Sequence, residues 1–204
     1  MKGTIAHYNR KRDFEQTPEP AGKTVKRTGR SLRFIVQKHR ATRLHYDFRL
    51  EAAGVLKSWA VPKGPSLDPG DRRLAMQVED HPLAYSTFEG VIPKGNYGAG
   101  EVIVWDRGTY KPKDTDRPEK AIASGEIKFT LRGKKLRGGF TLVKIRSRDG
   151  AENAWLLIKE RDEFVDRRWR AEAHEESVKS GRTLADLKKA KHLRRWISKP
   201  KKAD

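Results

Sequence analysis

The chain has 204 residues, with 46 Lys and Arg against 27 Asp and Glu, so its formal net charge is +19. This excess of cations favours a polyanionic partner over a neutral one, because Lys and Arg displace counterions from phosphates. Cysteine is absent, which excludes disulfides, thiolate metal sites and cysteine nucleophiles. No apolar signal segment or membrane anchor is evident, so we expect a cytoplasmic, nucleoid-associated protein with no membrane partner.

The first four fifths of the chain predict an arm followed by a β-rich core. Residues 1–30 are polar and basic with little periodicity, and we expect them to form an N-terminal arm that packs on the core. Residues 31–160 contain short apolar segments separated by turns rich in Pro, Gly and Asp. The expected strands are Leu32–Gln37, Leu44–Glu51, Ser58–Val61, Leu74–Val78, Tyr85–Gly90, Glu101–Trp105, Glu126–Leu131, Gly139–Ile145 and Ala154–Lys159. This spacing favours a mainly β fold with a compact, closed or partly closed β-barrel, and a sandwich is the other architecture that it allows.

Residues 161–204 change to a helical and strongly basic pattern. We expect helices over Glu163–Ser180 and from Thr183 to Ile197, and Thr183 and Asp186 have the spacing of a capping box. The charge of this C-terminal extension is suited to nucleic acid, while a solvated helix with a polar tail is the alternative.

The most informative segment is Leu44–Leu50, where apolar and polar residues alternate. On a β-strand, His45, Asp47 and Arg49 share one face, and the apolar residues occupy the other. His39 lies upstream, close enough to return through a short turn as a third metal ligand. Imidazole and carboxylate ligands suit Mn²⁺ or a related ion such as Co²⁺, and the planar Arg49 guanidinium suits two phosphate oxygens.

Further polar residues occur along the β-rich region, and each one taken alone is typical of an ordinary strand or loop. They are Gln37 two residues before His39, Lys63 in a turn, Arg73 at the edge of a strand, His81 before Pro82, and Tyr85. Together they supply the cations, imidazole and hydroxyl that would hold a phosphate beside a metal ion.

These segments resemble a known family. Gln37–Leu50 is similar to the signature of the 3′-phosphoesterase domain of bacterial DNA ligase D. The similarity continues through Trp59–Ser66, Gln77–Pro82, Phe88–Pro93, Tyr97–Gly100, Val104–Gly108, and Lys11–Phe14 with Glu19 in the arm. It spans residues 8–160, and a run of this length is far more specific than a single short motif.

The resemblance implies a DNA-repair hydrolase that removes a 3′-terminal ribonucleoside and then the remaining 3′-phosphate, using manganese, to leave a 3′-OH for end joining. It implies His39, His45 and Asp47 as metal ligands. It also implies phosphate contacts from Arg49, Lys63, Arg73, His81 and Tyr85, with Gln37 close by, and arm residues Arg12, Asp13 and Glu19 that serve the activity. His81 is either a proton donor to the leaving oxygen or a clamp for the transition state.

In ligase D this domain is fused to a ligase and a polymerase, whereas we expect this chain to be a stand-alone member. The near-match Ser147–Gly150 to a nucleotidyltransferase motif lacks the nucleophilic Lys, so ligation would fall to a separate DNA ligase. The expected partners are DNA 3′ ends in primer–templates or double-strand breaks, and other end-joining proteins.

Two alternatives stay open at this point. His45 and Asp47 with His81 also fit the two-His-one-carboxylate set of a non-haem iron oxygenase, in which His39 would be spare. A non-catalytic DNA-binding module would bind DNA in a salt-sensitive way without metal-dependent turnover.

Overall fold

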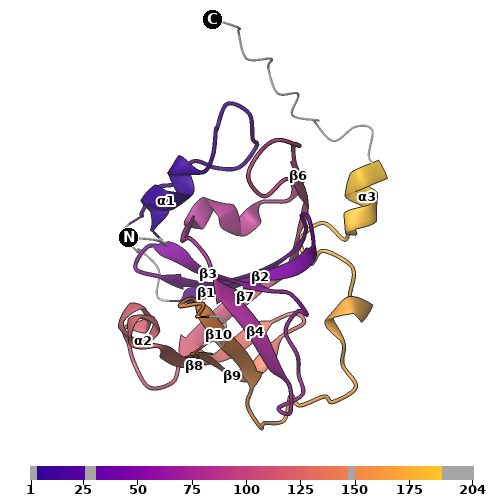
Figure 1. The fold of residues 1–204 in the computed structure, drawn as a ribbon. Helices are drawn as coiled ribbons and strands as arrows, with labels where there is room; N and C mark the ends of the chain where they lie inside the picture. The colour runs from indigo at the N-terminus through magenta and orange to yellow at the C-terminus, as the bar shows by residue number, and fades with distance from the viewer. Residues whose placement is uncertain (1–3, 26–30, 147–149, 190–204) are drawn as a thin grey trace, which may run out of the picture.

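The computed structural model describes residues 4–25, 31–146 and 150–189, and its core is an eight-stranded antiparallel β-barrel (Figure 1). The strands follow the order β1-β2-β3-β4-β10-β9-β8-β7, and pairing of β1 with β7 closes the ring. Outside the ring, β5 pairs with β3 and β6 pairs with β7. The prediction of a mainly β fold with a closed barrel is confirmed, and the sandwich is excluded.

The barrel strands are β1 (Leu32–Arg40), β2 (Leu44–Ala52), β3 (Val55–Val61), β4 (Arg72–Gln77), β7 (Gly100–Pro112), β8 (Glu126–Gly133), β9 (Arg137–Lys144) and β10 (Ala154–Lys159). The outer strands are β5 (His81–Pro82) and β6 (Gly90–Ile92). The helices are α1 (Ile5–Arg10), α2 (Pro118–Ser124) and α3 (Leu184–Lys189), with 3₁₀ turns η1 (Leu83–Thr87) and η2 (Ala171–Ala173).

The strand predicted over Tyr85–Gly90 is wrong, because Leu83–Thr87 forms η1, which Phe88 closes by donating its N–H to the Tyr85 carbonyl. Helix α2 is absent from the sequence prediction, although both of its ends carry ordinary signals. Pro118 occupies the first turn, and Gly125 ends the helix with φ 97°, a conformation that only glycine adopts readily.

The interior of the barrel is filled by aromatic and aliphatic side chains. Tyr46 and Phe48 of β2 point inward and are almost completely buried, as the alternation predicts. Phe129 of β8 packs against Phe48, with ring centroids 5.9 Å apart. Leu44, expected on the buried face, is instead 39% exposed because it lies where β2 begins.

A second apolar layer covers the outer wall of β1, β3 and β7. Tyr8 of α1 and Tyr85 of η1 pack there with the strand residues Ile35, Leu56 and Val104, and all five are buried. The N-terminal arm therefore covers the outer face on which His45, Asp47 and Arg49 lie, and polar side chains of the barrel wall become buried beneath it.

The helix predicted over Glu163–Ser180 is wrong. Asp162, Asp166 and Ser177 each accept hydrogen bonds from backbone N–H groups two residues ahead, and such local turns compete with a helix. The Trp169 side chain also packs against Trp105 of the barrel, with ring centroids 5.9 Å apart.

The second predicted C-terminal helix begins as expected. The Asp186 N–H donates to Thr183 Oγ1, and the Thr183 N–H donates to Asp186 Oδ2, so the capping box is confirmed. Leu184 and Leu187 of α3 pack on Ile103 of β7. The predicted continuation beyond residue 189 lies outside the described residues.

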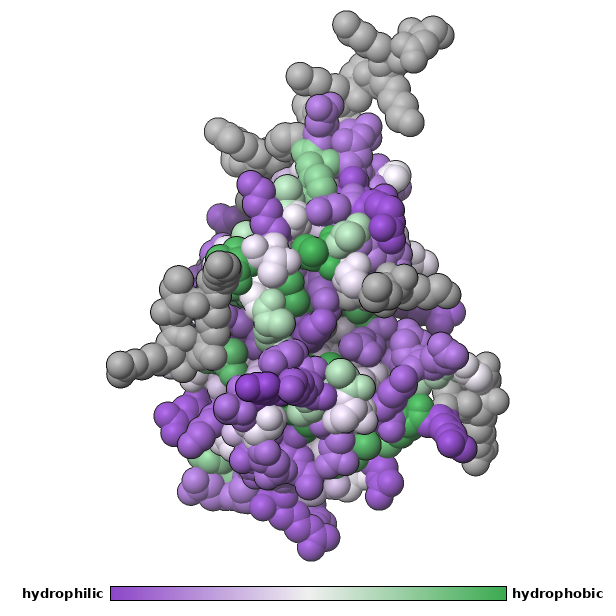
Figure 2. Space-filling view, turned by 90° about the vertical axis from the view of Figure 1, so that its left-hand side faces the viewer, coloured by the Kyte–Doolittle hydropathy of each residue, from purple (hydrophilic) through white to green (hydrophobic). Residues whose placement is uncertain are grey.

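Figure 2 shows a mostly hydrophilic face with small, separate groups of hydrophobic residues. Within the described segments, no helix has the length and apolar character needed to cross a membrane.

Replacing Phe129 with Ala should lower the free energy of unfolding by about 3–5 kcal/mol, because a fully buried ring is lost and a cavity remains. Urea unfolding followed by tryptophan fluorescence measures the change. Leu74→Ala is the control, since Leu74 is 44% exposed on β4, and its effect should stay within about 0.5 kcal/mol. Equal losses in the two variants would contradict the assignment of the core.

Candidate metal and phosphate site

The hairpin of β1 and β2 brings two imidazoles and a carboxylate together. Antiparallel pairing sets His39 opposite His45, and Asp47 follows two residues along β2. Asp47 Oδ2 lies 3.6 Å from His39 Nδ1, and Asp47 Oδ1 lies 3.6 Å from His45 Nε2. One potential ligand atom from each side chain lies within 4.8 Å of the others. Metal–ligand bonds of about 2.1 Å place ligand atoms about 3–4 Å apart, so this group fits one ion after small movements.

Hydrogen bonds on the outer side of each ring orient these imidazoles. His39 Nε2 lies 2.9 Å from the Gly98 carbonyl oxygen, and His45 Nδ1 lies 3.0 Å from the Arg43 carbonyl oxygen. A carbonyl only accepts, so each outer nitrogen donates a proton to it, and in a neutral ring the inner nitrogen then presents a lone pair to Asp47. Two lone pairs facing a carboxylate repel it, whereas a cation between them would satisfy all three groups.

The carboxylate of Asp47 is kept ionised by its neighbours. Burial alone would raise the pKa of Asp47, but the adjacent Arg49 guanidinium holds it well below its usual range. Arg49 Nη2 donates to Asp47 Oδ2 over 3.1 Å. The Asp47 carboxylate is therefore charged throughout the neutral pH range.

Arg49 occupies the centre of the site and is only 2% exposed. Besides Asp47, its guanidinium donates from Nε to Gln37 Oε1 over 2.9 Å and from Nη1 to Ser58 Oγ over 2.8 Å. These bonds use three of the five N–H groups of a guanidinium, so one N–H on each terminal nitrogen is left for an anion. The ring of Tyr85 lies 5.1 Å from the guanidinium carbon.

His81 connects to Arg49 through Ser58, whose hydroxyl accepts from Arg49 Nη1 and lies 3.4 Å from His81 Nδ1. Its Nδ1 lies 2.9 Å from the Glu79 carbonyl oxygen, and its Nε2 lies 3.4 Å from Arg12 Nη2. Since arginine only donates, Nε2 is the accepting nitrogen. Burial, together with the positive charges of Arg49 and Arg12, lowers the pKa of His81 well below its ordinary value.

The arm reaches this group through Arg12 and Glu19. Arg12 Nε donates to Glu19 Oε1 over 2.8 Å, and Arg12 Nη1 donates to Glu79 Oε1 over 3.2 Å. The Tyr85 hydroxyl donates to the same Glu19 oxygen over 3.0 Å. Lys11 pairs with the other oxygen of Glu79 at 3.0 Å. The arm therefore contributes charges to the site itself.

The structure does not bring every predicted residue into this group. Arg73 pairs with Asp71 at 2.8 Å, and it lies opposite Leu157, whose side chain fills the barrel interior. Arg73 therefore points to the opposite face of the sheet from Asp47. Lys63 is exposed in the turn after β3, and Asp13 is exposed in the arm, where it accepts a hydrogen bond from the Glu15 N–H. Their phosphate-binding and arm roles stay predictions.

Two residues of the site were not identified from the sequence. Ser58 lies directly opposite Arg49 in the pairing of β2 with β3, and its hydroxyl also lies 3.4 Å from His81 Nδ1. Glu79 is buried and joins Lys11 to Arg12. The signal for Ser58 is that it is a small polar residue on a mostly apolar strand, and the charge of Glu79 alone does not distinguish it from surface residues.

The barrel and these side chains define a candidate site for a metal ion and a phosphate on the outer wall of β1 and β2. The model of the DNA Ligase D 3′-phosphoesterase domain family matches residues 37–144, which include the three ligand candidates and Arg49. The chain belongs to this family.

Similar proteins carry the same domain within much longer chains. The chain is 52% identical over 184 residues to the multifunctional non-homologous end joining protein LigD of Pseudomonas aeruginosa, covering 88% of the chain and 22% of that protein. It is 41% identical over 165 residues to the LigD protein of Mycolicibacterium smegmatis, covering 78% and 21%. It is 46% identical over 140 residues to that of Mycobacterium tuberculosis, covering 69% and 18%. The chain thus spans about a fifth of the length of these relatives.

Acid should destabilise the wild-type protein more than the variant His81→Gln. The pKa of His81 is lower in the folded protein than in the unfolded chain. Below about pH 6.5, the unfolded chain therefore takes up a proton at His81 that the folded protein does not. This contribution to stability is present above that pH and is lost as the pH falls toward the folded pKa. Thermal unfolding between about pH 7.5 and about pH 5 should show a steeper fall of the midpoint for wild type. Equal slopes would contradict a buried neutral ring.

Proposed function

We propose that this protein is a metal-dependent phosphoesterase that processes DNA 3′ ends. It removes 3′-terminal ribonucleosides as a phosphodiesterase and 3′-phosphates as a phosphomonoesterase, and it leaves a 3′-OH for end joining. The observation that carries the proposal is the group formed by His39, His45 and Asp47 directly beside the buried guanidinium of Arg49. Membership of the 3′-phosphoesterase domain family supports the class of reaction.

His39, His45 and Asp47 would hold the metal, with Mn²⁺ or Co²⁺ as the ions that such ligands suit. A bound ion would supply Lewis acidity that withdraws charge from phosphorus. Arg49 is fixed by Gln37 and Ser58 so that its two remaining N–H groups donate to phosphate oxygens, where negative charge grows in the transition state.

His81 supplies the proton for the leaving oxygen in this proposal. In the free protein its Nε2 is unprotonated, because the ring is buried and because Arg49 and Arg12 repel a further positive charge, so the pKa of His81 lies well below its ordinary value. A phosphate beside these arginines offsets their charge, which raises the pKa of His81 and allows Nε2 to take up a proton. That nitrogen then donates the proton to the departing oxygen as its bond to phosphorus breaks and a water molecule bonds to phosphorus instead.

The proposed partners follow from charge and from the relatives. A net charge of +19 favours DNA, and the relatives are named for non-homologous end joining. We therefore propose DNA 3′ ends at primer–templates or double-strand breaks as substrates. DNA ligation and other end-joining proteins would act with this activity at the nucleoid.

The oxygenase hypothesis requires His81 as a ligand and leaves His39 spare. His81 instead directs its two nitrogens to Glu79 and Arg12, while His39 faces Asp47. The binding-module hypothesis gives no reason to bury Arg49 with two unused N–H groups beside three potential metal ligands. Neither alternative is supported by a specific contact.

Metal binding is testable without catalysis. Manganese chloride should raise the thermal midpoint of the wild-type protein, because a ligand at one hundred times its Kd stabilises a fold by about 2.7 kcal/mol. Asp47→Asn should abolish this rise, since it removes the charged ligand with little change of shape. Asp114→Asn is the matched control at an exposed position and should respond like wild type. A rise of equal size in both variants would argue against the proposed ligands.

Activity should be assayed on a primer–template that ends in one 3′-ribonucleotide, with manganese, and in parallel on a 3′-phosphate primer. Wild type should convert both ends to 3′-OH. Arg49→Lys should lower the rate by about a hundredfold or more, because an ammonium does not reproduce the planar set of bonds to Asp47, Gln37 and Ser58. Arg107→Lys, at an exposed position on β7, is the control. Failure of wild type on both ends, at any manganese concentration, would refute the proposed function.

A further inference from the structure

Tyr97 differs from the other tyrosines in its exposure. Tyr8, Tyr46, Tyr85 and Tyr110 are buried, with at most 4% of each exposed, whereas Tyr97 is 48% exposed. A single exposed aromatic residue needs no explanation by itself. Tyr97, however, lies beside the candidate site and along a cavity, so its exposed ring is accessible to a bound substrate.

The loop between β6 and β7 fixes Tyr97 relative to the candidate metal ligands. Gly95 and Gly98 have positive φ values of 90° and 74°, which give the loop its sharp turns. The carbonyl of Gly98 is the hydrogen-bond partner of His39 Nε2 at 2.9 Å. Tyr97 is therefore the direct neighbour of a residue that orients a candidate metal ligand.

The arm holds the ring of Tyr97 in place. Lys11 Nζ donates to the Tyr97 hydroxyl over 3.0 Å and lies 4.3 Å from the ring centroid. Lys11 is itself anchored by Glu79 at 3.0 Å, and Glu79 also binds Arg12, which contacts His81. The ring is thus ordered before any ligand arrives, so little conformational entropy remains to be lost on binding.

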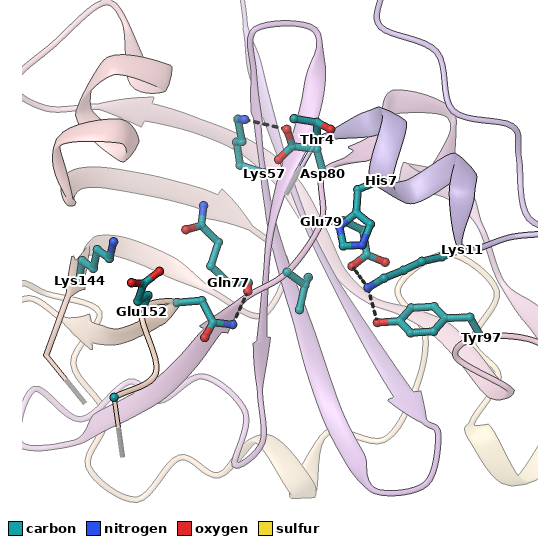
Figure 3. Close-up of a pocket in the computed structure, with 13 residues that line it drawn as sticks. Thr4, His7, Lys11, Lys57, Gln77, Glu79, Asp80, Tyr97, Lys144 and Glu152 are labelled. Atoms are coloured by element: carbon teal, nitrogen blue, oxygen red, sulfur yellow. Dashed lines mark hydrogen bonds and ion pairs between the residues drawn. The ribbon is translucent and has the colours of Figure 1, made fainter. Parts of the chain in front are cut away.

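Tyr97 lines a cavity of about 880 Å³ (Figure 3). In this view Lys11 and Tyr97 lie on one side of the cavity, and Lys144 and Glu152 lie on the other. Glu79 belongs both to the wall of the cavity and to the network that reaches His81. Glu79 therefore links the cavity to the network that holds His81.

We propose that Tyr97 stacks on the nucleobase of the 3′-terminal nucleoside, the group that leaves in the phosphodiesterase reaction. This inference rests on the proposed function for the identity of the leaving group. Every base presents a π face, so a tyrosine platform accepts any of them without reading sequence. The cationic side chain of Lys11 beside the ring suits the neighbouring phosphate backbone.

Stacking on the leaving nucleobase would affect only one of the two proposed reactions. A ribonucleotide end places a nucleoside beyond the scissile phosphate, whereas a 3′-phosphate end has no nucleoside there. Tyr97 is then a specificity-determining residue for the diester substrate alone. The monoester depends on the metal ligands, Arg49 and His81 but not on Tyr97.

The test compares Tyr97→Ala and Tyr97→Phe with wild type on three primers, which end in a ribonucleotide, in an abasic ribose or in a 3′-phosphate. Tyr97→Ala should raise KM for the ribonucleotide end by about tenfold with a smaller change in kcat, because stacking is lost. Tyr97→Phe keeps the ring and should resemble wild type. On the abasic and 3′-phosphate ends, Tyr97→Ala and wild type should be equal. Val91→Ala, exposed on the preceding strand β6, is the control.

A fluorescence measurement makes the result independent of turnover. A primer ending in 2-aminopurine should be quenched on binding wild type or Tyr97→Phe, and quenched less on binding Tyr97→Ala. If wild type cleaves none of the primers but the quenching still differs between wild type and Tyr97→Ala, the proposed function fails and the stacking contact stands. Equal quenching by all variants, or a Tyr97→Ala defect of the same size on all three primers, would overturn the stacking proposal, since Tyr97 would then serve only to hold the arm.

Discussion

The alternation of side chains along β2 is the constraint on which the rest of the structure depends. Tyr46 and Phe48 enter the barrel interior, while His45, Asp47 and Arg49 occupy the outer wall. The closed ring fixes the register of β2 against β1 and β3, so a slip by one residue would exchange the core and the site. The same packing that stabilises the barrel therefore holds the ligand candidates at fixed spacing.

Burial of charge on the outer wall requires the arm. Burying an isolated ion costs on the order of several kcal/mol of hydration free energy, so each charge needs partners. The network contains three cations and three anions, namely Lys11, Arg12 and Arg49 with Glu19, Asp47 and Glu79. Its charges balance before any ligand arrives. A divalent cation and a phosphate would enter such a network together without leaving a large net charge.

The site extends beyond the segment that the family model matches. That match begins at residue 37, yet Arg12 and Glu19 of the arm contact His81 and Tyr85. The C-terminal segment also packs on the barrel, where the Trp105 Nε1–H donates to the His174 carbonyl. Segments at both ends of the described chain thus pack on the core, and the arm contributes charged side chains to the site.

The sequence by itself determined the features that depend on neighbours along the chain. Period-two alternation predicted β2 and its polar face, and the capping box predicted the start of α3, because strand pleat and helix capping are local geometry. Only the tertiary structure decided that Arg73 faces away from Asp47, since the face of a distant strand depends on how the barrel closes. It also replaced the helix predicted over Glu163–Ser180 with turns, because contacts with the barrel and side-chain hydrogen bonds outweigh helix propensity. Glu79 and Ser58 joined the site for the same reason: a buried network is defined by contacts across strands, which no spacing in the sequence records.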